Sequence, residues 1–236
     1  MNPNGVAIVS GGLDSVTMLY HLYDNGMRPY VLSFDYNQKH AKELDFARLA
    51  AERLGLSWTL IDLSSVGELL AGASSSLVND SVAVPEGHYA ADTMKATVVP
   101  NRNMMMAAIA TSVCIAQDGY WVAAGPHNGD AAIYPDCRPV FWHSLEDSIR
   151  RANEGFLPIG WHFKLPFIYA SKGDIALEAK RLKVPVELTW SCYKGGDRHC
   201  GRCGTCVERL EAMDFAGIVD KTKYEDTTFW KEQLKV

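Results

Sequence analysis

Short apolar runs alternate with amphipathic segments along the first half of the chain. Runs of mostly apolar residues predict buried strands at residues 6–9, 30–34, 58–61 and 120–124. Apolar positions at helical spacing predict helices at residues 15–25, 42–54, 102–117 and 171–182. Strands that alternate with helices in this way favour an α/β fold, in which a mainly parallel sheet carries helices on both faces.

Two segments refine this outline. Ser171 can act as the N-cap of the last of these helices, with Asp174 three residues further on. Residues 64–99 are rich in Ser, Ala and Gly and show little periodicity. We interpret that stretch as a loop insertion with room for one short helix.

The charge balance argues against one class of partner. The chain has 236 residues, with 28 acidic and 23 basic side chains, and its formal net charge is -5. Proteins that bind nucleic acid cluster Lys and Arg against the phosphates, and no such cluster occurs here. No apolar run has the length of a membrane span, and the first five residues lack the features of a signal peptide. We therefore expect a cytoplasmic protein without direct contacts to nucleic acid or membrane.

A glycine-containing motif follows the first predicted strand. It consists of Ser10, Gly11, Gly12, Leu13, Asp14 and Ser15. Ligands of open α/β sheets bind beyond the carboxyl ends of the strands, where glycines and a helix N-terminus let backbone N–H groups face an anion. The serine hydroxyls can donate to the same anion, and Asp14 can hold Mg²⁺ against phosphate oxygens. The alternative is an ordinary strand-to-helix turn with Asp14 or Ser15 as N-cap.

The six residues together resemble the PP-loop of the ATP pyrophosphatase superfamily. In that superfamily the loop binds the pyrophosphate that leaves when a substrate oxygen is adenylated. No Gly-Lys-Ser/Thr sequence follows the glycines, so the motif is not that of a P-loop nucleotidase. The resemblance implies that all six residues contact ATP.

Four of the six cysteines are clustered near the C-terminus, at Cys192, Cys200, Cys203 and Cys206. Four thiolates at this spacing suit a closed, structural zinc site. An iron–sulfur cluster also takes four thiolates, but the fourth ferredoxin cysteine follows the Cys-x-x-Cys-x-x-Cys run, whereas here it precedes the run. Replacement of one cysteine by His199 is a further alternative. We divide the chain into an α/β domain at residues 1–188 and a zinc-binding segment at 189–236 that packs on the same domain.

A third group of polar residues follows the fourth predicted strand, at residues 130–138. The carboxylates of Asp130 and Asp136 can accept hydrogen bonds from the N1–H and exocyclic amine of a guanine-like base. Tyr134 can stack on such a ring, and Arg138 can hold a carboxylate or a phosphate. The alternative is a surface loop with an internal Asp136–Arg138 salt bridge. A catalytic thiol at Cys137 is conceivable, although no activating base is visible beside it.

Taken in order, the motifs resemble the QueC family of 7-cyano-7-deazaguanine synthases. The matching stretches are residues 10–15, 99–103 (VPNRN), 133–139 (IYPDCRP) and 189–206, and the resemblance covers about residues 5–215. It implies a Rossmann-like sheet, one structural Zn²⁺ on the four clustered cysteines, Mg²⁺ with ATP, and a homodimer. It also implies conversion of 7-carboxy-7-deazaguanine and ammonia into the 7-cyano base with two ATP, through adenylated and amide intermediates, in queuosine-type biosynthesis.

The resemblance places Arg102 and Asn103 near the nucleotide or the substrate. We expect catalytic roles for Asp14, Arg102, Asp136 and Arg138. We expect the base to be bound by Asn103, Asp130, Tyr134, Asp136 and Arg138. The chain departs from many family members at Pro126, Asn128 and Val140, which leaves the detailed fit of the base open.

Three other functions are compatible with parts of this pattern. A PP-loop synthetase that stops at the amide, or acts on another acceptor, would share the first half-reaction. A PP-loop enzyme that thiolates tRNA would need a basic surface, which the net charge of -5 argues against. A zinc-knuckle module that binds nucleotide as a structural ligand would have no use for the complete loop with its aspartate.

Overall fold

The computed structural model describes residues 4–70, 75–89 and 92–233. Within them, a parallel sheet has the strand order β3-β2-β1-β4-β5. Its strands are β1 (Val6–Ile8), β2 (Tyr30–Asp35), β3 (Trp58–Asp62), β4 (Trp121–Ala123) and β5 (His162–Lys164). The four strands predicted from apolar runs are confirmed within one or two residues. The three-residue strand β5 was not predicted, because so short an element leaves no periodic pattern.

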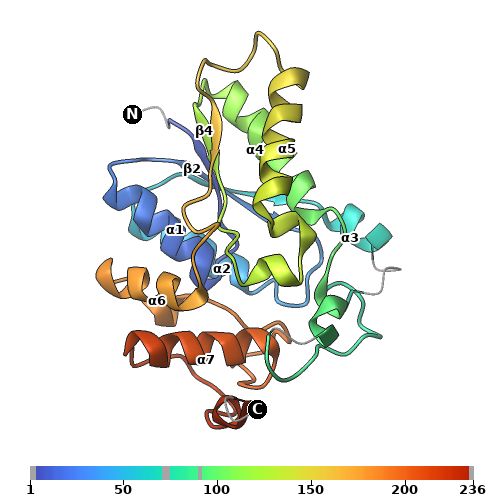
Figure 1. Ribbon diagram of the computed structural model, residues 1–236, viewed down its shortest axis with the longest axis vertical. Helices are drawn as coiled ribbons and strands as arrows, with labels where there is room; N and C mark the ends of the chain where they lie inside the picture. The colour runs from blue at the N-terminus through green and yellow to red at the C-terminus, as the bar shows by residue number, and fades with distance from the viewer. Residues whose placement is uncertain (1–3, 71–74, 90–91, 234–236) are drawn as a thin grey trace.

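Helices cover both faces of the sheet (Figure 1), as the sequence pattern predicted. The α-helices are α1 (Leu13–Asp24), α2 (Glu43–Arg53), α3 (Ser64–Leu70), α4 (Arg102–Ala116), α5 (Pro139–Ala152), α6 (Lys172–Arg181), α7 (Gly204–Ala216) and α8 (Phe229–Gln233). One apolar cluster joins α1, α2, α6 and α7 to one face, and a second joins α4 and α5 to the other. The fold is therefore a three-layered α/β structure.

The sheet order follows from the crossovers. The chain moves outward from β1 through β2 to β3, and then returns along α4 to place β4 on the other side of β1. Val6 pairs with Tyr30 on one side and with Val122 on the other. The order of the strands therefore reverses at β1 and β4. In open α/β sheets the crevice beyond such a reversal is the usual ligand site.

Helices α5 and α7 were missing from the sequence prediction. In α5 the buried residues Trp142, Leu145 and Ile149 lie at helical spacing, and Pro139 occupies the first turn, so the signal was present. Helix α7 begins at Gly204, inside the cysteine run. Cys203 is its N-cap, so the helix starts within the cysteine cluster.

The capping box of α6 is confirmed. The Ser171 hydroxyl accepts a hydrogen bond from the Asp174 N–H, and the Asp174 carboxylate accepts one from the Ser171 N–H. This reciprocal pair satisfies donors that the first turn of a helix leaves free. It sets the point at which Lys172 enters the helix, next to the cavity described below.

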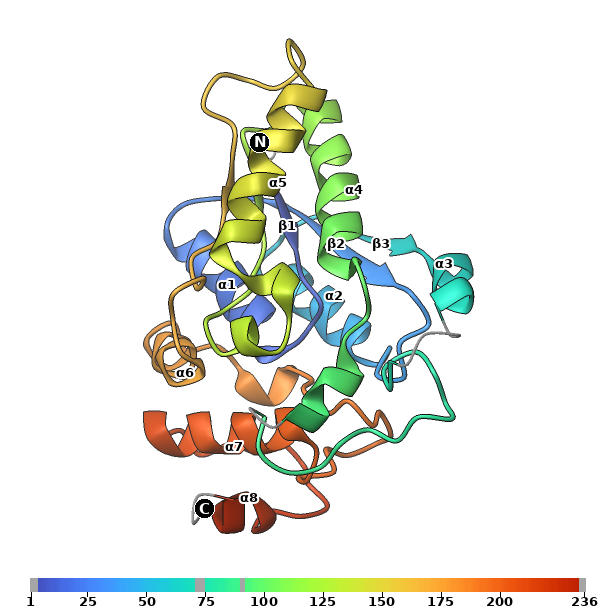
Figure 2. The ribbon, with the colours of Figure 1, turned by 45° about the vertical axis from the view of Figure 1, so that its right-hand side comes forward.

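The insertion at residues 64–99 contains α3 and a 3-10 helix, η1 (Asp92–Thr97), while residues 71–74 and 90–91 lie outside the described residues. It is more than a surface loop. Leu77 is fully buried against Tyr36 and Val99, and Glu86 forms an isolated bridge with Cys203. The insertion therefore runs from the edge of the sheet to the cysteine segment (Figure 2).

The C-terminal segment is continuous with the α/β domain. Helix α7 lies along α6, and the Trp190 N–H donates to the Gly11 carbonyl. Arg209 is fully buried and ties the segment together through Asp220 and the carbonyl of Val186. In the described part of the chain, no helix is both long and apolar enough to cross a membrane.

Candidate active site

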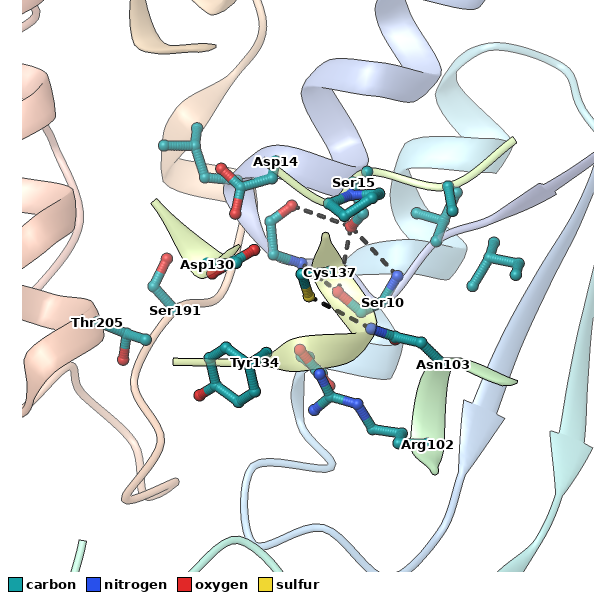
Figure 3. A pocket seen from close by; sticks show the side chains of 18 of the residues that line it. Ser10, Asp14, Ser15, Arg102, Asn103, Asp130, Tyr134, Cys137, Ser191 and Thr205 are labelled. Atoms are coloured by element: carbon teal, nitrogen blue, oxygen red, sulfur yellow. Dashed lines mark hydrogen bonds between the residues drawn. The ribbon is translucent and has the colours of Figure 1, made fainter. Parts of the chain in front are cut away.

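A cavity of about 210 Å³ opens at the carboxyl ends of β1 and β4, where the strand order reverses. Ser10 follows β1 and Gly125 follows β4, and both line it. Its other walls come from the segment after β2, the start of α4, the loop after β4 and the cysteine segment. Figure 3 shows side chains from the loop after β1, the start of α4, the loop after β4 and the cysteine segment facing one hollow. The cavity has the position that the topology predicts for a ligand.

The loop at residues 10–15 has a specific conformation that an ordinary turn does not require. Gly11 has φ of 98°, and a Cβ there would lie 1.9 Å from the Glu43 carbonyl oxygen. The Ser15 hydroxyl oxygen accepts hydrogen bonds from the N–H groups of Ser10 and Gly11, both at 3.2 Å. Gly12 is the N-cap of α1, and no side chain caps the helix. The alternative with Asp14 or Ser15 as N-cap is therefore wrong, and the first N–H groups of α1 are available to an anion.

Asp14 lies at the centre of a half-buried charge cluster. Its Oδ2 is 2.7 Å from the Lys172 Nζ, which also lies 3.0 Å from Glu208 Oε2. Burial by itself would raise the pKa of Asp14, but Lys172 and then His127 outweigh it and lower the pKa. Burial would lower the pKa of Lys172, but Asp14 and Glu208 raise it. Asp14 is therefore an anion and Lys172 a cation, and Asp14 Oδ1 remains buried without a hydrogen-bond partner.

His127 has a defined role in this cluster although the sequence assigned it none. It is 1% exposed, and its Nδ1 accepts a hydrogen bond from the Gly129 N–H at 3.1 Å. Because Nδ1 is the acceptor of that bond, Nε2 is the ring nitrogen that can donate. That atom lies 3.5 Å from Asp130 Oδ2 and 3.9 Å from Asp14 Oδ2. His127 thus lies within 4 Å of both carboxylates.

Arg102 is the first residue of α4 and lies on the opposite side of the cavity from this cluster. Its guanidinium lies 3.4 Å from the Tyr36 hydroxyl and 5.9 Å from the centre of the Tyr134 ring. Among the ion pairs formed by the described residues, none gives Arg102 a carboxylate partner. It is a cation in the cavity wall with no anionic partner within ion-pair distance among the described residues, so an anionic ligand is its natural partner.

The loop after β4 brings Asp130 and Tyr134 to the cavity, as predicted. The Asp130 carboxylate accepts a hydrogen bond from the Tyr89 hydroxyl at 3.0 Å. The Tyr134 ring is 3% exposed, and its hydroxyl hydrogen-bonds with Thr97. A carboxyl oxygen that can accept hydrogen bonds and an aromatic face therefore lie on one wall, which suits a flat base with N–H donors.

Of the remaining predicted base-binding residues, one lines the cavity and two lie outside it. Asn103 lines the cavity, with its side-chain amide donating to the Asp136 carbonyl at 3.3 Å. The Asp136 carboxylate accepts a hydrogen bond from the Asn103 N–H at 3.2 Å and does not line the cavity. Arg138 is exposed, donates to the Ala131 carbonyl at 2.9 Å, and also lies outside the lining. Asp136 thus serves the start of α4 in this geometry, and no Asp136–Arg138 salt bridge occurs among the described ion pairs.

Cys137 lines the cavity as a buried thiol. Asn103 is its hydrogen-bond donor, 3.4 Å from the sulfur. Burial, followed by Asp130 and Asp136, raises the pKa of Cys137 well above its ordinary value. The thiol is therefore protonated at neutral pH, which argues against a nucleophilic role because the thiolate is the reactive form.

The four clustered cysteines converge as a metal site requires. Cys192, Cys200, Cys203 and Cys206 are all buried, and their sulfur atoms lie within 4.8 Å of one another. A tetrahedral ion with bonds of about 2.3 Å separates its sulfur ligands by about 3.8 Å. The Cys200 and Cys206 sulfurs are 4.0 Å apart. The donor set therefore fits a structural metal ion. His199 is not part of this group of four, and its Nε2 accepts a hydrogen bond from the Ser191 N–H at 3.0 Å.

Several cavity residues escaped the sequence analysis. These residues form four groups: those after β2, the tyrosine of the insertion, the lysine that starts α6, and those beside the cysteines. They are Tyr36, His40, Glu43, Tyr89, Lys172, Trp190, Ser191, Tyr193 and Thr205. The group after β2 had a usable signal, because polar residues directly after a parallel strand lie at the same edge as the loop after β1. The others come from folding of distant segments onto that edge.

Comparison with known proteins agrees with this geometry. The family described as "Queuosine biosynthesis protein QueC" matches residues 4–217. The chain belongs to the QueC family. It is 50% identical over 227 residues to "7-cyano-7-deazaguanine synthase" of Chelativorans sp. (strain BNC1), covering 96% of each chain. The protein of the same name from Brucella ovis is 49% identical, covering 96% of this chain and 95% of that one.

A solved structure supports the fold. The NMN synthetase from Francisella tularensis aligns over 98% of this chain and 85% of its own, with a TM-score of 0.50 and 13% sequence identity. At that identity the likeness concerns the fold alone. The Rossmann-like architecture inferred from the sequence is thereby confirmed. The expected clustering of the four C-terminal cysteines is confirmed by the convergence of their sulfur atoms.

Proposed function

We propose that this QueC-family chain is an ATP-dependent carbon–nitrogen ligase that converts 7-carboxy-7-deazaguanine and ammonia into 7-cyano-7-deazaguanine. The observation that carries the proposal is the single cavity that brings the loop at residues 10–15, Arg102 and Asp130 together. Curated relatives that match the chain over nearly their whole lengths are named for this activity. The family description places the product in queuosine biosynthesis.

The loop side of the cavity suits ATP. The N-terminus of α1, the Ser10 hydroxyl and Lys172 can neutralise pyrophosphate as it leaves. The unpartnered Oδ1 of Asp14 is a suitable ligand for the Mg²⁺ that accompanies ATP. We assign Asp14 two tasks: holding Lys172 in place and supplying an oxygen to that ion.

The opposite side suits a base that carries a carboxylate. Arg102, without an anionic partner in the described ion pairs, can bind the substrate carboxylate next to the phosphates. Asp130 can accept hydrogen bonds from N1–H and the amine of the base, with Tyr134 along its face. We leave Arg138 out of this assignment because it is exposed outside the cavity.

The chemistry needs two activations of one carbon. Oxide is a very poor leaving group, so the carboxylate oxygen must first become the oxygen of AMP before ammonia can displace it. The resulting amide loses its oxygen in the same way, which leaves the nitrile. One cavity can serve both steps, because the amide oxygen lies where the carboxylate oxygen lay. The protein contributes positioning and charge neutralisation, without a covalent nucleophile.

The amide test separates this function from its nearest alternative. Supplied directly, 7-amido-7-deazaguanine should become nitrile with ATP and no added ammonia, because its nitrogen is already in place. Starting from the acid, mass analysis should find one ammonia and two ATP used per nitrile. An inert amide alongside nitrile from the acid would rule out the sequential scheme. If only amide formed, the chain would be the amide-forming relative, and Pro126, which lines the cavity, would be the first residue to change.

Two further assignments complete the proposal. Zn²⁺ is the proposed occupant of the cysteine cluster, because its closed Cys₄ donor set matches a structural site. A homodimer follows from the family resemblance, and sedimentation of the purified protein tests it.

A further inference from the structure

Glu43 is the first residue of α2, and its carboxyl group lines the cavity between the loop after β1 and Arg102. The residue is 7% exposed. Its backbone is fixed against the loop, because the Glu43 carbonyl oxygen occupies the space that a side chain at position 11 would need. The Ser10 hydroxyl and the Arg102 charge both act on its carboxyl group. Glu43 thus lies between the proposed phosphate site and the proposed carboxylate site.

Among the ion pairs of the described residues, no lysine or arginine contacts this carboxyl, although the Arg102 charge acts on it from a greater distance. Its own segment contributes the Gln38 amide at 3.5 Å, the His40 Nε2 at 3.4 Å and Tyr36. Burial, followed by the charge of Arg102, lowers the pKa of His40 to about 3, so this histidine is neutral. Burial raises the pKa of Glu43 to about 8, against the lowering effects of Arg102, Gln38 and Ser10. Asp14, by contrast, is paired with Lys172 at 2.7 Å.

An ionised Glu43 would oppose the reaction. Both ligands of the proposed function are anions at the reacting end, and a third negative charge between them would repel each. A neutral carboxylic acid has the opposite effect, since its O–H can donate a hydrogen bond to an anionic oxygen. We propose that Glu43 takes part in adenylation as a neutral carboxylic acid that donates a hydrogen bond to a phosphate oxygen held between Ser10 and Arg102. This inference rests on the proposed function and names a further catalytic residue for it.

The step balances without a transferred proton. The substrate carboxylate oxygen forms a bond to the α-phosphorus of ATP, the bond from that phosphorus to the bridging oxygen breaks, and pyrophosphate leaves with the electron pair. Glu43 keeps its proton and stabilises negative charge on the phosphate. A role as general base or as metal ligand would instead require the ionised carboxylate.

Glu43→Gln distinguishes these possibilities, because the amide is neutral at every pH and can still donate. We would measure single-turnover release of pyrophosphate from the acid and ATP without ammonia, so that the titration of ammonia does not interfere. In the wild type, release should fall as pH rises through about 8, where Glu43 ionises. The Gln variant should retain at least a tenth of the wild-type rate at neutral pH and lack that fall. Glu52→Gln, in the exposed part of the same helix, should behave as the wild type.

Each other outcome overturns the proposal. An inactive Gln variant beside an active Glu43→Asp variant would make Glu43 a base or a metal ligand. A Gln variant that keeps the alkaline fall would assign the fall to another group. Should the Gln variant fold poorly, infrared spectra of the wild type decide: a protonated-carboxyl band must disappear through pH 8 in step with activity, and its absence would refute the idea. If the wild type released no pyrophosphate, the proposed function itself would fail.

Discussion

The cavity has two walls that owe their order to different causes. The loop wall is a contiguous run after β1, and its shape follows from local features: Gly11 at a positive φ and the Ser15 hydroxyl bonded to two backbone N–H groups. The cysteine wall contributes Trp190, Ser191 and Thr205. Ser191 precedes one predicted metal ligand, and Thr205 lies between two others, with its hydroxyl 3.4 Å from the Cys203 sulfur.

The cysteine cluster lies next to the cavity, because residues adjacent to its cysteines line it. The described residues 189–203 form no helix or strand. Hydrogen bonds to Arg209 and to the loop wall help to hold them in place. A metal ion on the four sulfurs would fix the residues between them, and with them one side of the substrate site. The residues proposed for the reaction and those proposed for metal binding are therefore different but adjacent in space. Substitutions in the two walls should impair different properties of the protein.

The loop wall should fail in chemistry alone. Asp14→Ala should keep the fold, because Lys172 retains Glu208 at 3.0 Å, but should reduce pyrophosphate release by roughly 10³-fold or more through loss of the charges that hold phosphate. Both half-reactions should stop equally, measured with the acid and with the amide. Asp45→Ala, an exposed carboxylate in the first turn of α2, is the matched control and should change neither. Near-normal turnover in Asp14→Ala would reduce the motif to a turn.

The cysteine wall should fail in folding first. Cys203→Ser should lose the metal and most of the folded yield, because binding energy at such a site is folding energy, of order 10 kcal/mol. Cys114→Ala removes a buried thiol far from the cluster and should cost only about 1 kcal/mol of unfolding free energy, measured by denaturant titration. Elemental analysis of the wild type should find one zinc per chain. Iron together with a visible charge-transfer band would contradict that assignment.

The smallest effects are expected for Arg102 and Arg138, both of which were predicted from the sequence to be catalytic. Their substitutions should change the Michaelis constant to different extents. Arg102→Gln removes the uncompensated cation, and the Michaelis constant for the acid substrate should rise about 10- to 100-fold, the value of a charged hydrogen bond. Arg138→Gln should change it by less than about twofold, because the side chain is exposed and contacts only a carbonyl. Steady-state kinetics of both variants check this. A larger effect for Arg138 would mean that its loop closes over the substrate.

Local pattern was sufficient for much of the fold. The first four strands could be predicted because apolar runs between amphipathic helices have few other structures, and the start of α6 because Ser171 and Asp174 form a reciprocal cap. The brief strand β5 and the start of α7 could not, since three residues carry no period and the helix begins within the metal cluster.

The site, like the fold, has a part that the sequence predicted and a part that it did not. The sequence by itself indicated the loop at residues 10–15 and the four-cysteine cluster, because each is a set of residues close in sequence whose chemistry depends on spacing. Only the tertiary structure decided which predicted side chains share the cavity. It placed Arg102 inside and Arg138 outside, and it brought Lys172, His127 and Glu43 to the loop after β1. The physical reason is that the charge state and accessibility of these groups depend on burial and on partners far away in sequence, which no local spacing encodes.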